Sequence, residues 1–250
     1  MSDIPPPIPA ATLVLMRPVA DGGPPELLMM ERPATMAFAA GALVFPGGRI
    51  EEQDHAVAAG LAGGFADGAA RIAAIRETIE ETGIAVGLSP SPSQETLETV
   101  RAGLLGGGDF ASLLADSGLT LDPGVLVPFA RWCPNFRETR RFDASFFVAA
   151  VPADTPDPTP QAGEVTRALW GSAVTILQDG DAHTIFPTRR NLERLARFAS
   201  FEEAREDAER HTVRTITPWV EQRDGEQWIC IPADLGYPVT AERLETAKRR

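Results

Sequence analysis

Cysteine and histidine, the usual zinc ligands, are scarce in this chain of 250 residues, which contains 2 Cys and 3 His. Cys133 and Cys230 lie far apart and form no Cys-x-x-Cys pair, which argues against a disulfide framework or a zinc knuckle. We expect both to be small core residues. His55, His183 and His211 lack the His-x-His or His-x-x-x-His spacing of a ligand pair, so we expect no histidine-based metal site.

Long apolar runs are also missing, since no stretch approaches the ~18–20 apolar residues that a membrane-spanning helix needs. The first residues, Met1–Pro9, are polar and proline-rich rather than basic and then apolar, which is not the pattern of a secretory signal. We therefore expect a cytoplasmic protein with no membrane partner.

Positive charge is in deficit, because 23 Lys+Arg stand against 35 Asp+Glu and leave a net charge of −12. The overall field repels polyanions, so we expect no nucleic-acid partner, and any phosphate contact requires a local basic cluster. Gly106–Gly108 lacks the Lys-Ser/Thr of a P-loop, and the sequence contains no Gly-x-Ser-x-Gly. P-loop NTPase and serine hydrolase chemistry are therefore disfavoured.

The composition that remains is that of a globular protein, with 44% hydrophobic and 23% charged residues. The chain has no internal repeat and no shift in composition that marks a boundary. We therefore predict a single α/β domain over residues 1–250, with a proline-rich lead at 1–10 and a C-terminal helical and hairpin extension at 187–250.

Apolar runs bounded by glycine and proline predict the strands, and Ala-rich or amphipathic segments predict the helices. Strands are expected at Ala11–Arg17, Glu26–Glu31, Ala42–Phe45, Val125–Trp132, Ala144–Val151 and Glu164–Trp170. Helices are expected at Ala56–Phe65, Ala69–Thr82, Gln94–Leu105, Phe110–Ser117, Ala173–Gln178 and Asn191–Arg210, and a hairpin at Thr215–Gln222 and Gln227–Pro232.

Three carboxylates share one face of the helix predicted over Ala69–Thr82. Glu77, Glu80 and Glu81 stand at positions i, i+3 and i+4, which a helix brings within a few ångströms of one another. Each like-charge pair costs only ~0.2–0.5 kcal/mol on an exposed helix, so a solvated acidic face is one interpretation. A site for a hard cation such as Mg²⁺ or Mn²⁺ is the other, since carboxylate oxygens are its preferred ligands.

A glycine pair provides a second element of the pattern. Gly47 and Gly48 follow a predicted strand, and without side chains they allow a metal or phosphate to approach the main chain. The two elements together, Gly47-Gly48 and Arg76–Ile84 (RETIEETGI), resemble the signature of the Nudix hydrolases. The signature consists of a glycine loop, a glutamate, and then Arg-Glu-hydrophobic-x-Glu-Glu-x-Gly-hydrophobic.

The resemblance implies a Nudix-type α/β/α sandwich with a mixed sheet. The distance from Gly48 to Arg76 exceeds that of the compact motif, which implies an insertion at 52–68 inside the signature region. The early glutamate of the motif has no in-register match, because Glu51, Glu52 and Asp54 all stand nearby, so we assign that role to none of them. Thr78 replaces the usual aliphatic residue.

Roles follow from the resemblance residue by residue. It implies Mg²⁺ or Mn²⁺ as the cofactor, bound by Glu77, Glu80 and Glu81 with a backbone carbonyl from Gly47 or Gly48. Arg76 would orient these carboxylates through ion pairs. The implied reaction is attack of water on one phosphorus of a diphosphate. The proton acceptor is Glu77 or Glu81, with Glu164 as a further candidate.

For the substrate, Phe38–Arg49 and Arg140–Asp143, together with the insertion and the C-terminal hairpin, resemble the branch that contains the peroxisomal coenzyme A diphosphatases. That resemblance implies cleavage of coenzyme A or acyl-CoA. Arg32, Arg137, Arg140 and Arg141 are the predicted substrate-binding residues, because forked guanidinium donors suit phosphate.

Three alternatives stay open for the function and the assembly. The substrate can instead be ADP-ribose or another nucleotide-sugar or dinucleotide. The chain can instead be a non-catalytic Nudix module that senses a nucleotide. In each case the partner is a small nucleotide-type molecule, and a homodimer is possible.

Overall fold

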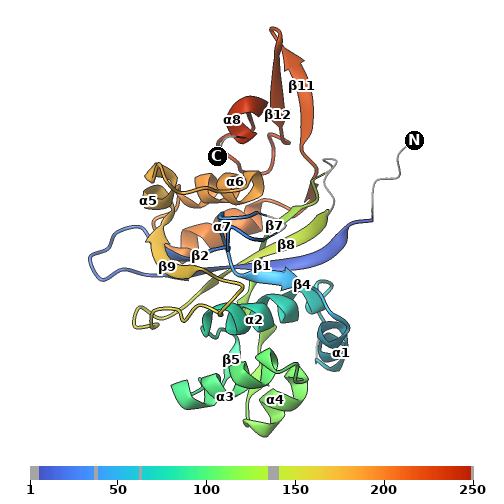
Figure 1. Cartoon of the computed structure of the whole chain (residues 1–250), viewed down its shortest axis with the longest axis vertical. Helices are drawn as coiled ribbons and strands as arrows, with labels where there is room; N and C mark the ends of the chain where they lie inside the picture. Colours follow the sequence, from blue (N-terminus) through green and yellow to red (C-terminus); the bar gives the residue numbers. More distant parts are fainter. Residues whose placement is uncertain (1–5, 37–38, 62–63, 135–140, 249–250) are drawn as a thin grey trace.

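The structure is a computed structural model that describes residues 6–36, 39–61, 64–134 and 141–248. Its centre is an eight-stranded mixed sheet (Figure 1) with the order β10-β7-β8-β1-β2-β3, in which β4 also pairs with β1 and β9 with β2. The strands of this sheet are β1 (Ile8–Arg17), β2 (Glu26–Glu31), β3 (Leu43–Val44), β4 (Gly47–Arg49), β7 (Val127–Trp132), β8 (Phe142–Ala150), β9 (Arg167–Ser172) and β10 (Thr215–Ile216).

Successive side chains of a strand point to opposite faces of the sheet. The central strands consist of consecutive apolar residues, so both faces of the sheet are apolar there. In β1, Leu13 and Leu15 enter one core, whereas Val14 and Met16 enter the other. β1 runs parallel to β8 in register from Ile8–Phe142 to Met16–Ala150. The central strands therefore separate two hydrophobic cores.

Helices cover both faces, so the predicted α/β/α sandwich with a mixed sheet is confirmed. α2 (Gly68–Thr82) packs on the face of Leu13 and Leu15, and α6 and α7 contribute to the opposite core. Besides α2, the helices are α1 (Glu52–Gly60), α3 (Gln94–Leu105), α4 (Phe110–Asp116), α5 (Ala173–Gln178), α6 (Phe186–Leu195), α7 (Phe201–Arg210) and α8 (Leu244–Lys248), with a 3₁₀ turn at Pro123–Val125.

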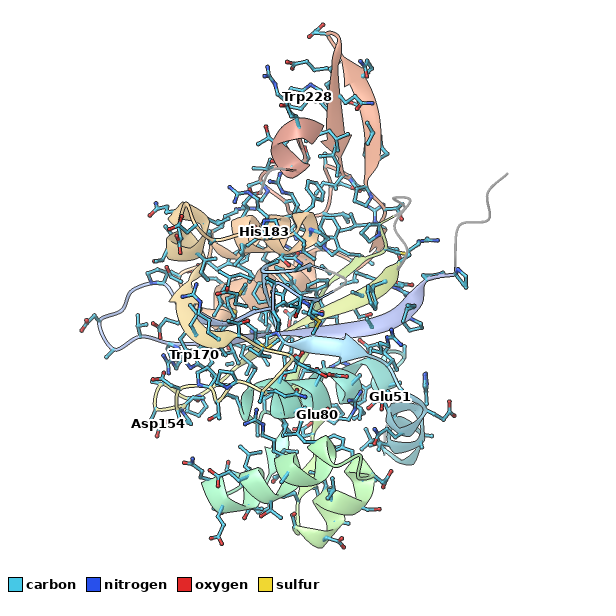
Figure 2. All side chains as sticks on the ribbon, in the orientation of Figure 1. Glu51, Glu80, Asp154, Trp170, His183 and Trp228 are labelled. Carbon is cyan, nitrogen blue, oxygen red and sulfur yellow. The ribbon has the colours of Figure 1, made fainter. Side chains whose placement is uncertain are left out.

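Two small sheets lie outside the central one. β5 (Leu88–Ser89) pairs with β6 (Thr120–Leu121), and β11 (Trp219–Arg223), β12 (Glu226–Cys230) and β13 (Ala241–Arg243) form a three-stranded sheet. The second of these projects from the body near the C-terminus, and its Trp228 lies apart from Glu51 and Glu80 beside α2 (Figure 2).

Several predicted boundaries differ from the structure. β1 begins at Ile8, inside the proline-rich lead, because it pairs with β8 from its first residue. The helix expected from residue 56 begins at Glu52, where the Glu51 N–H donates to the Asp54 carboxylate. In the insertion, the chain therefore becomes helical directly after β4.

The C-terminal part is also divided differently. The helix predicted over 191–210 consists of α6 and α7, because Ser200 caps a new helix by accepting the N–H of Glu203. The first arm of the predicted hairpin is split at Pro218: β10 joins the central sheet, and only β11 pairs with β12.

Both cysteines are buried and unpaired, as expected. Within the four described ranges, we find no helix long and apolar enough to cross a bilayer.

The packing of α2 predicts a stability effect at Ile79, which is fully buried. We expect Ile79→Ala to lower the free energy of unfolding by about 2–5 kcal/mol, because it leaves a cavity under the helix. Leu105→Ala is the matched control, since Leu105 is 47% exposed and its truncation should cost no more than about 0.5 kcal/mol. Urea unfolding measures both, and equal losses would contradict this packing.

Candidate functional site

The candidate site is built on α2, the helix that carries the three glutamates. Its apolar face is made of alanine and isoleucine side chains buried against the sheet. Gly83 ends the helix in the left-handed conformation, with φ +69, and its N–H bonds to the carbonyl of Ile79. Thr78 is tolerated in the core because its hydroxyl donates to the Ala74 carbonyl at 2.7 Å.

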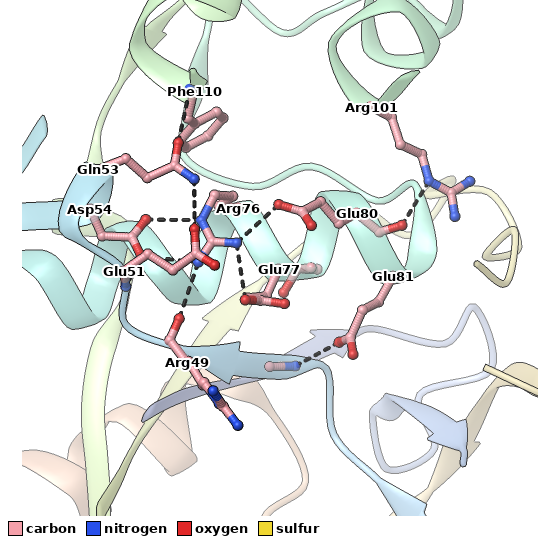
Figure 3. Close-up of polar contacts among 12 residues, drawn as sticks. Arg49, Glu51, Gln53, Asp54, Arg76, Glu77, Glu80, Glu81, Arg101 and Phe110 are labelled. Carbon is pink, nitrogen blue, oxygen red and sulfur yellow. Dashed lines mark hydrogen bonds and ion pairs between the residues drawn. The ribbon is translucent and has the colours of Figure 1, made fainter. Parts of the chain in front are cut away.

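Arg76 lies at the centre of a polar cluster that includes Asp54, Glu77 and Glu80 (Figure 3). The guanidinium is almost fully buried and bonds both oxygens of Asp54 at 3.0 Å. Nη1 donates to Glu77 and to Glu80, each at 3.0 Å, and Nη2, which also bonds Asp54, donates to the Arg49 carbonyl at 3.1 Å. Arg76 therefore makes the ion pairs that the sequence resemblance implies, and it fixes α2 to the end of β4.

Asp54 is the functional residue that sequence reasoning missed. Its side chain is fully buried, and its carboxylate forms a bidentate ion pair with Arg76. The signal was its position six residues after Gly48, which was obscured because Glu51 and Glu52 stand so close by.

Glycine is required at both positions because β4 lies very close to α2 and to β1. A Cβ on Gly48 would lie 2.3 Å from the Glu77 carboxyl carbon, and a Cβ on Gly47 would lie 2.3 Å from the Ala11 carbonyl. The Gly47 N–H donates to Glu81 at 2.8 Å. Because β4 has no side chain at these two positions, the carboxylates of Glu77 and Glu81 lie directly against its backbone.

Burial changes the titration of these carboxylates. It raises the pKa of Glu77 to about 7, although the positive charge of Arg76 opposes the shift. Burial also raises the pKa of Glu81 well above its ordinary value, and the neighbouring charge of Glu77 adds to the effect. The pKa of Glu80 is raised in the same direction by burial. Without a cation, burial therefore favours the protonated form of these three carboxyl groups.

A divalent cation fits this donor set, because hard carboxylate oxygens with raised pKa values are stabilised by added positive charge. The side chains are nevertheless not gathered around one point, and among the described residues no three His, Cys, Asp or Glu are arranged as ligands of a single ion. The physical reason is that Arg76 holds Glu77 and Glu80, while Gly47 holds Glu81.

A cavity of about 540 Å³ adjoins the cluster. Its acidic part comprises Glu51, Glu77, Glu81 and Glu164, and both glycines of β4 contribute to the wall. Glu80 is not among the lining residues. Of the three predicted metal-binding glutamates, the structure therefore brings Glu77 and Glu81 to the cavity, with Glu80 behind them.

The rest of the cavity is apolar and basic. Phe45, Trp132, Phe142 and Phe146 form aromatic wall, and α6 contributes Pro187 from its first turn. Three arginines line the same space, namely Arg32, Arg49 and Arg141. The charge of Arg32 acts to lower the pKa of Glu81, although burial dominates that shift.

The predicted substrate-binding residues divide into two groups. Arg32 and Arg141 line the cavity, and Arg49 is a lining arginine that sequence analysis did not select. Arg137 and Arg140 lie outside the described residues. The neighbouring Arg131 forms an exposed ion pair with Asp143 at 2.7 Å instead of lining the cavity.

Glu164 lines the cavity, but the strand predicted over Glu164–Trp170 is wrong in its beginning. β9 begins at Arg167, because the N–H groups of Glu164 and Val165 both bond to the Gln161 carbonyl in a turn. The Gln161 N–H in turn bonds to the Glu81 carbonyl. Glu164 is therefore presented by a loop fastened to the last turn of α2.

Arg101 of α3 strengthens this connection. Its guanidinium donates to the Glu80 carbonyl at 2.9 Å and to the Thr159 carbonyl at 2.7 Å. The Thr159 N–H bonds to the Thr82 carbonyl. The C-terminal carbonyls of α2 are thus satisfied by the segment that leads to Glu164.

No family model matches the chain. Among solved structures, it is similar to a Nudix hydrolase from Alicyclobacillus acidocaldarius, with 27% sequence identity and a TM-score of 0.70, over 82% of this chain and 97% of that chain. The chain therefore has the fold of this Nudix hydrolase.

Two further solved structures resemble the chain with lower TM-scores. One is the Nudix domain of NrtR from Shewanella oneidensis in complex with ADP-ribose, with 14% identity, a TM-score of 0.46, and coverage of 77% of this chain and 88% of that one. The other is a C. elegans Ap4A hydrolase, with 16% identity, a TM-score of 0.43, and coverage of 78% and 98%.

The approach of Gly48 to Glu77 predicts that Gly48→Ala weakens Mn²⁺ binding by about tenfold or more, because the added methyl group displaces the carboxylate. Gly60→Ala is the control, since no atom lies within 4 Å of the added Cβ. Isothermal titration calorimetry measures both affinities. Wild-type affinity in Gly48→Ala would show that the carboxylate position does not matter.

The raised pKa values predict how stability depends on pH without metal. An acid with a raised pKa binds more protons in the folded state, so stability falls as pH rises from its unfolded value through its folded value. For Glu77 this window extends from 4.5 to about 7. We expect the melting temperature of metal-free protein to fall across that window, and Mg²⁺ to restore it above the window.

Glu81→Gln should flatten that pH dependence, because the amide carries no charge at any pH in the window. Glu98→Gln is the control, since Glu98 is exposed on α3. Thermal unfolding at several pH values gives the comparison, and identical slopes for the two variants would rule out the burial argument.

Proposed function

We propose that this chain is a Mg²⁺- or Mn²⁺-dependent Nudix pyrophosphohydrolase that cleaves the diphosphate between a nucleotide and a second group. The supporting observation is the position of Glu77 and Glu81, which reach the cavity past the bare glycine backbone of β4. Glu77, Glu80 and Glu81, with a carbonyl from Gly47 or Gly48, would hold the cation. When bound, the cation supplies Lewis-acid assistance to attack of water on phosphorus.

The chain's own groups have separate tasks in this proposal. Glu77 is a candidate for the group that accepts a proton from the attacking water, because its carboxylate lines the cavity. Glu81 and Glu164 are the other candidates, since both line the cavity. Arg76 is buried behind them and acts as a positioning residue. Its five hydrogen bonds go to neighbouring carboxylates and a backbone carbonyl, so it orients the carboxylates and does not contact the substrate.

For the substrate we propose coenzyme A or an acyl-CoA. A cavity with aromatic wall beside arginines suits a ligand that combines a base, an apolar arm and several phosphates. Arg32 and Arg141 would bind its phosphates, together with Arg137 and Arg140 as sequence-based candidates. ADP-ribose or another nucleotide derivative is the alternative within the same chemistry.

Product analysis tests this function. The protein is incubated with Mn²⁺ and, separately, coenzyme A, an acyl-CoA, ADP-ribose, NADH and a dinucleoside polyphosphate, and products are identified by mass. Adenosine 3′,5′-bisphosphate from coenzyme A supports the proposed substrate. Cleavage of only the other compounds supports the alternative substrate, and binding without any product supports a nucleotide sensor.

The assigned carboxylates predict that Glu77→Gln and Glu81→Gln each lower kcat by at least about 10²-fold, because each removes a charged oxygen at the cavity. Folding should be preserved, since glutamine keeps the shape of the side chain. Glu98→Gln is again the control, with turnover unchanged. Wild-type turnover in both cavity variants would refute their roles.

A further inference from the structure

Two arginines of the cavity make no ion pair with any acidic side chain that the structure describes. No ion pair among the described residues includes Arg49 or Arg141, although the protein has an excess of acidic side chains. Within the described part of the chain, the buried Nε of Arg141 has no hydrogen-bond acceptor, and its Nη2 donates to the Cys133 sulfur at 3.2 Å. Sulfur is a weak acceptor, so the strongest donors of this guanidinium lack a matching group.

The sheet register places these two residues on either side of β1. Arg49 of β4 is the direct partner of Ala10, and Arg141 immediately precedes β8, whose Phe142 is the partner of Ile8. Strands two apart in a sheet are separated by roughly 10 Å. Both residues therefore stand near the beginning of β1, and both line the same cavity.

This part of the wall is separate from the carboxylates of α2. Figure 3 shows the Arg49 side chain directed away from Arg76 and Glu77, although its backbone carbonyl accepts from Arg76. The lining side chains nearest to it along the register, Ala10 and Ala144, are small. These small side chains leave room in the cavity beside Arg49.

We propose that Arg49 and Arg141 form an anion subsite that takes a phosphate monoester carried by the substrate in addition to its diphosphate. The chemistry of the two groups selects this ligand, because guanidinium forks match phosphate oxygens and a dianion balances two cations. The subsite rests on the proposed function only in that the ligand is the group attached to the diphosphate. The subsite would select substrates that carry a phosphate outside the diphosphate.

Matched substrate pairs test the proposal in the full-length protein with Mn²⁺. The pairs are coenzyme A with 3′-dephospho-coenzyme A, and NADPH with NADH, which differ only by the phosphate monoester. We expect the phosphorylated member of at least one pair to have a kcat/KM about tenfold or more higher, mainly through KM. Cleavage of both members of each pair at equal efficiency would overturn the subsite while leaving the proposed function intact.

Substitutions of the arginines test whether these residues cause the preference for the phosphorylated substrate. Arg49→Gln and Arg141→Gln should each reduce the preference toward unity, through a higher KM for the member that carries the phosphate. Arg49→Lys should retain part of it, because lysine keeps the charge and loses the fork. The control is Arg131→Gln, since Arg131 pairs with Asp143 and does not line the cavity. A preference unchanged in both glutamine variants would refute their role.

A binding measurement separates this inference from the proposed function. Calorimetry of metal-free protein with adenosine 3′,5′-bisphosphate and with AMP needs no turnover. Tighter binding of the bisphosphate, lost in Arg49→Gln and Arg141→Gln, would support the subsite even if no diphosphate were cleaved. Equal affinity of the wild-type protein for the two nucleotides would overturn it, and so would a preference that persists in variants that melt at the wild-type temperature.

Discussion

The ion-pair cluster around Arg76 is the interaction on which the rest of the site depends. One buried guanidinium bonds Asp54, Glu77 and Glu80 and also a carbonyl of β4, so it joins three parts of the chain. A buried carboxylate without such a partner would become protonated, because desolvation penalises its charge. Arg76 thus keeps an acidic helix folded against the sheet while leaving net negative charge for a cation.

The glycine pair solves a related problem of space. α2 packs on one face of the sheet, whereas the aromatic side chains of the cavity belong to the opposite core. Carboxylates on α2 can meet a ligand on the other side only where the sheet has an edge without side chains. Gly47 and Gly48 provide that edge, and the Gly47 N–H holds Glu81 there.

The insertions and extensions contribute to the site as well as to the size of the protein. Asp54 comes from the inserted helix α1, and Arg101 of α3 links the last turn of α2 to the loop of Glu164. α6 supplies part of the cavity wall from the C-terminal extension. The carboxylate helix is therefore surrounded by segments that orient it and by segments that define what can bind beside it.

The sequence by itself determined the local pattern: the helix with three glutamates, the glycine pair, the sandwich and the scarcity of other metal ligands. Helical spacing and loop glycines act over short distances, so their consequences can be read along the chain. Tertiary structure decided which acid pairs with Arg76, where β9 begins, and that Arg49 shares a cavity with Arg141 while Arg131 pairs with Asp143. Residue spacing held a signal only for Asp54, which stands six residues after Gly48. The other outcomes depend on strand register and on contacts between distant segments, which spacing along the chain does not encode.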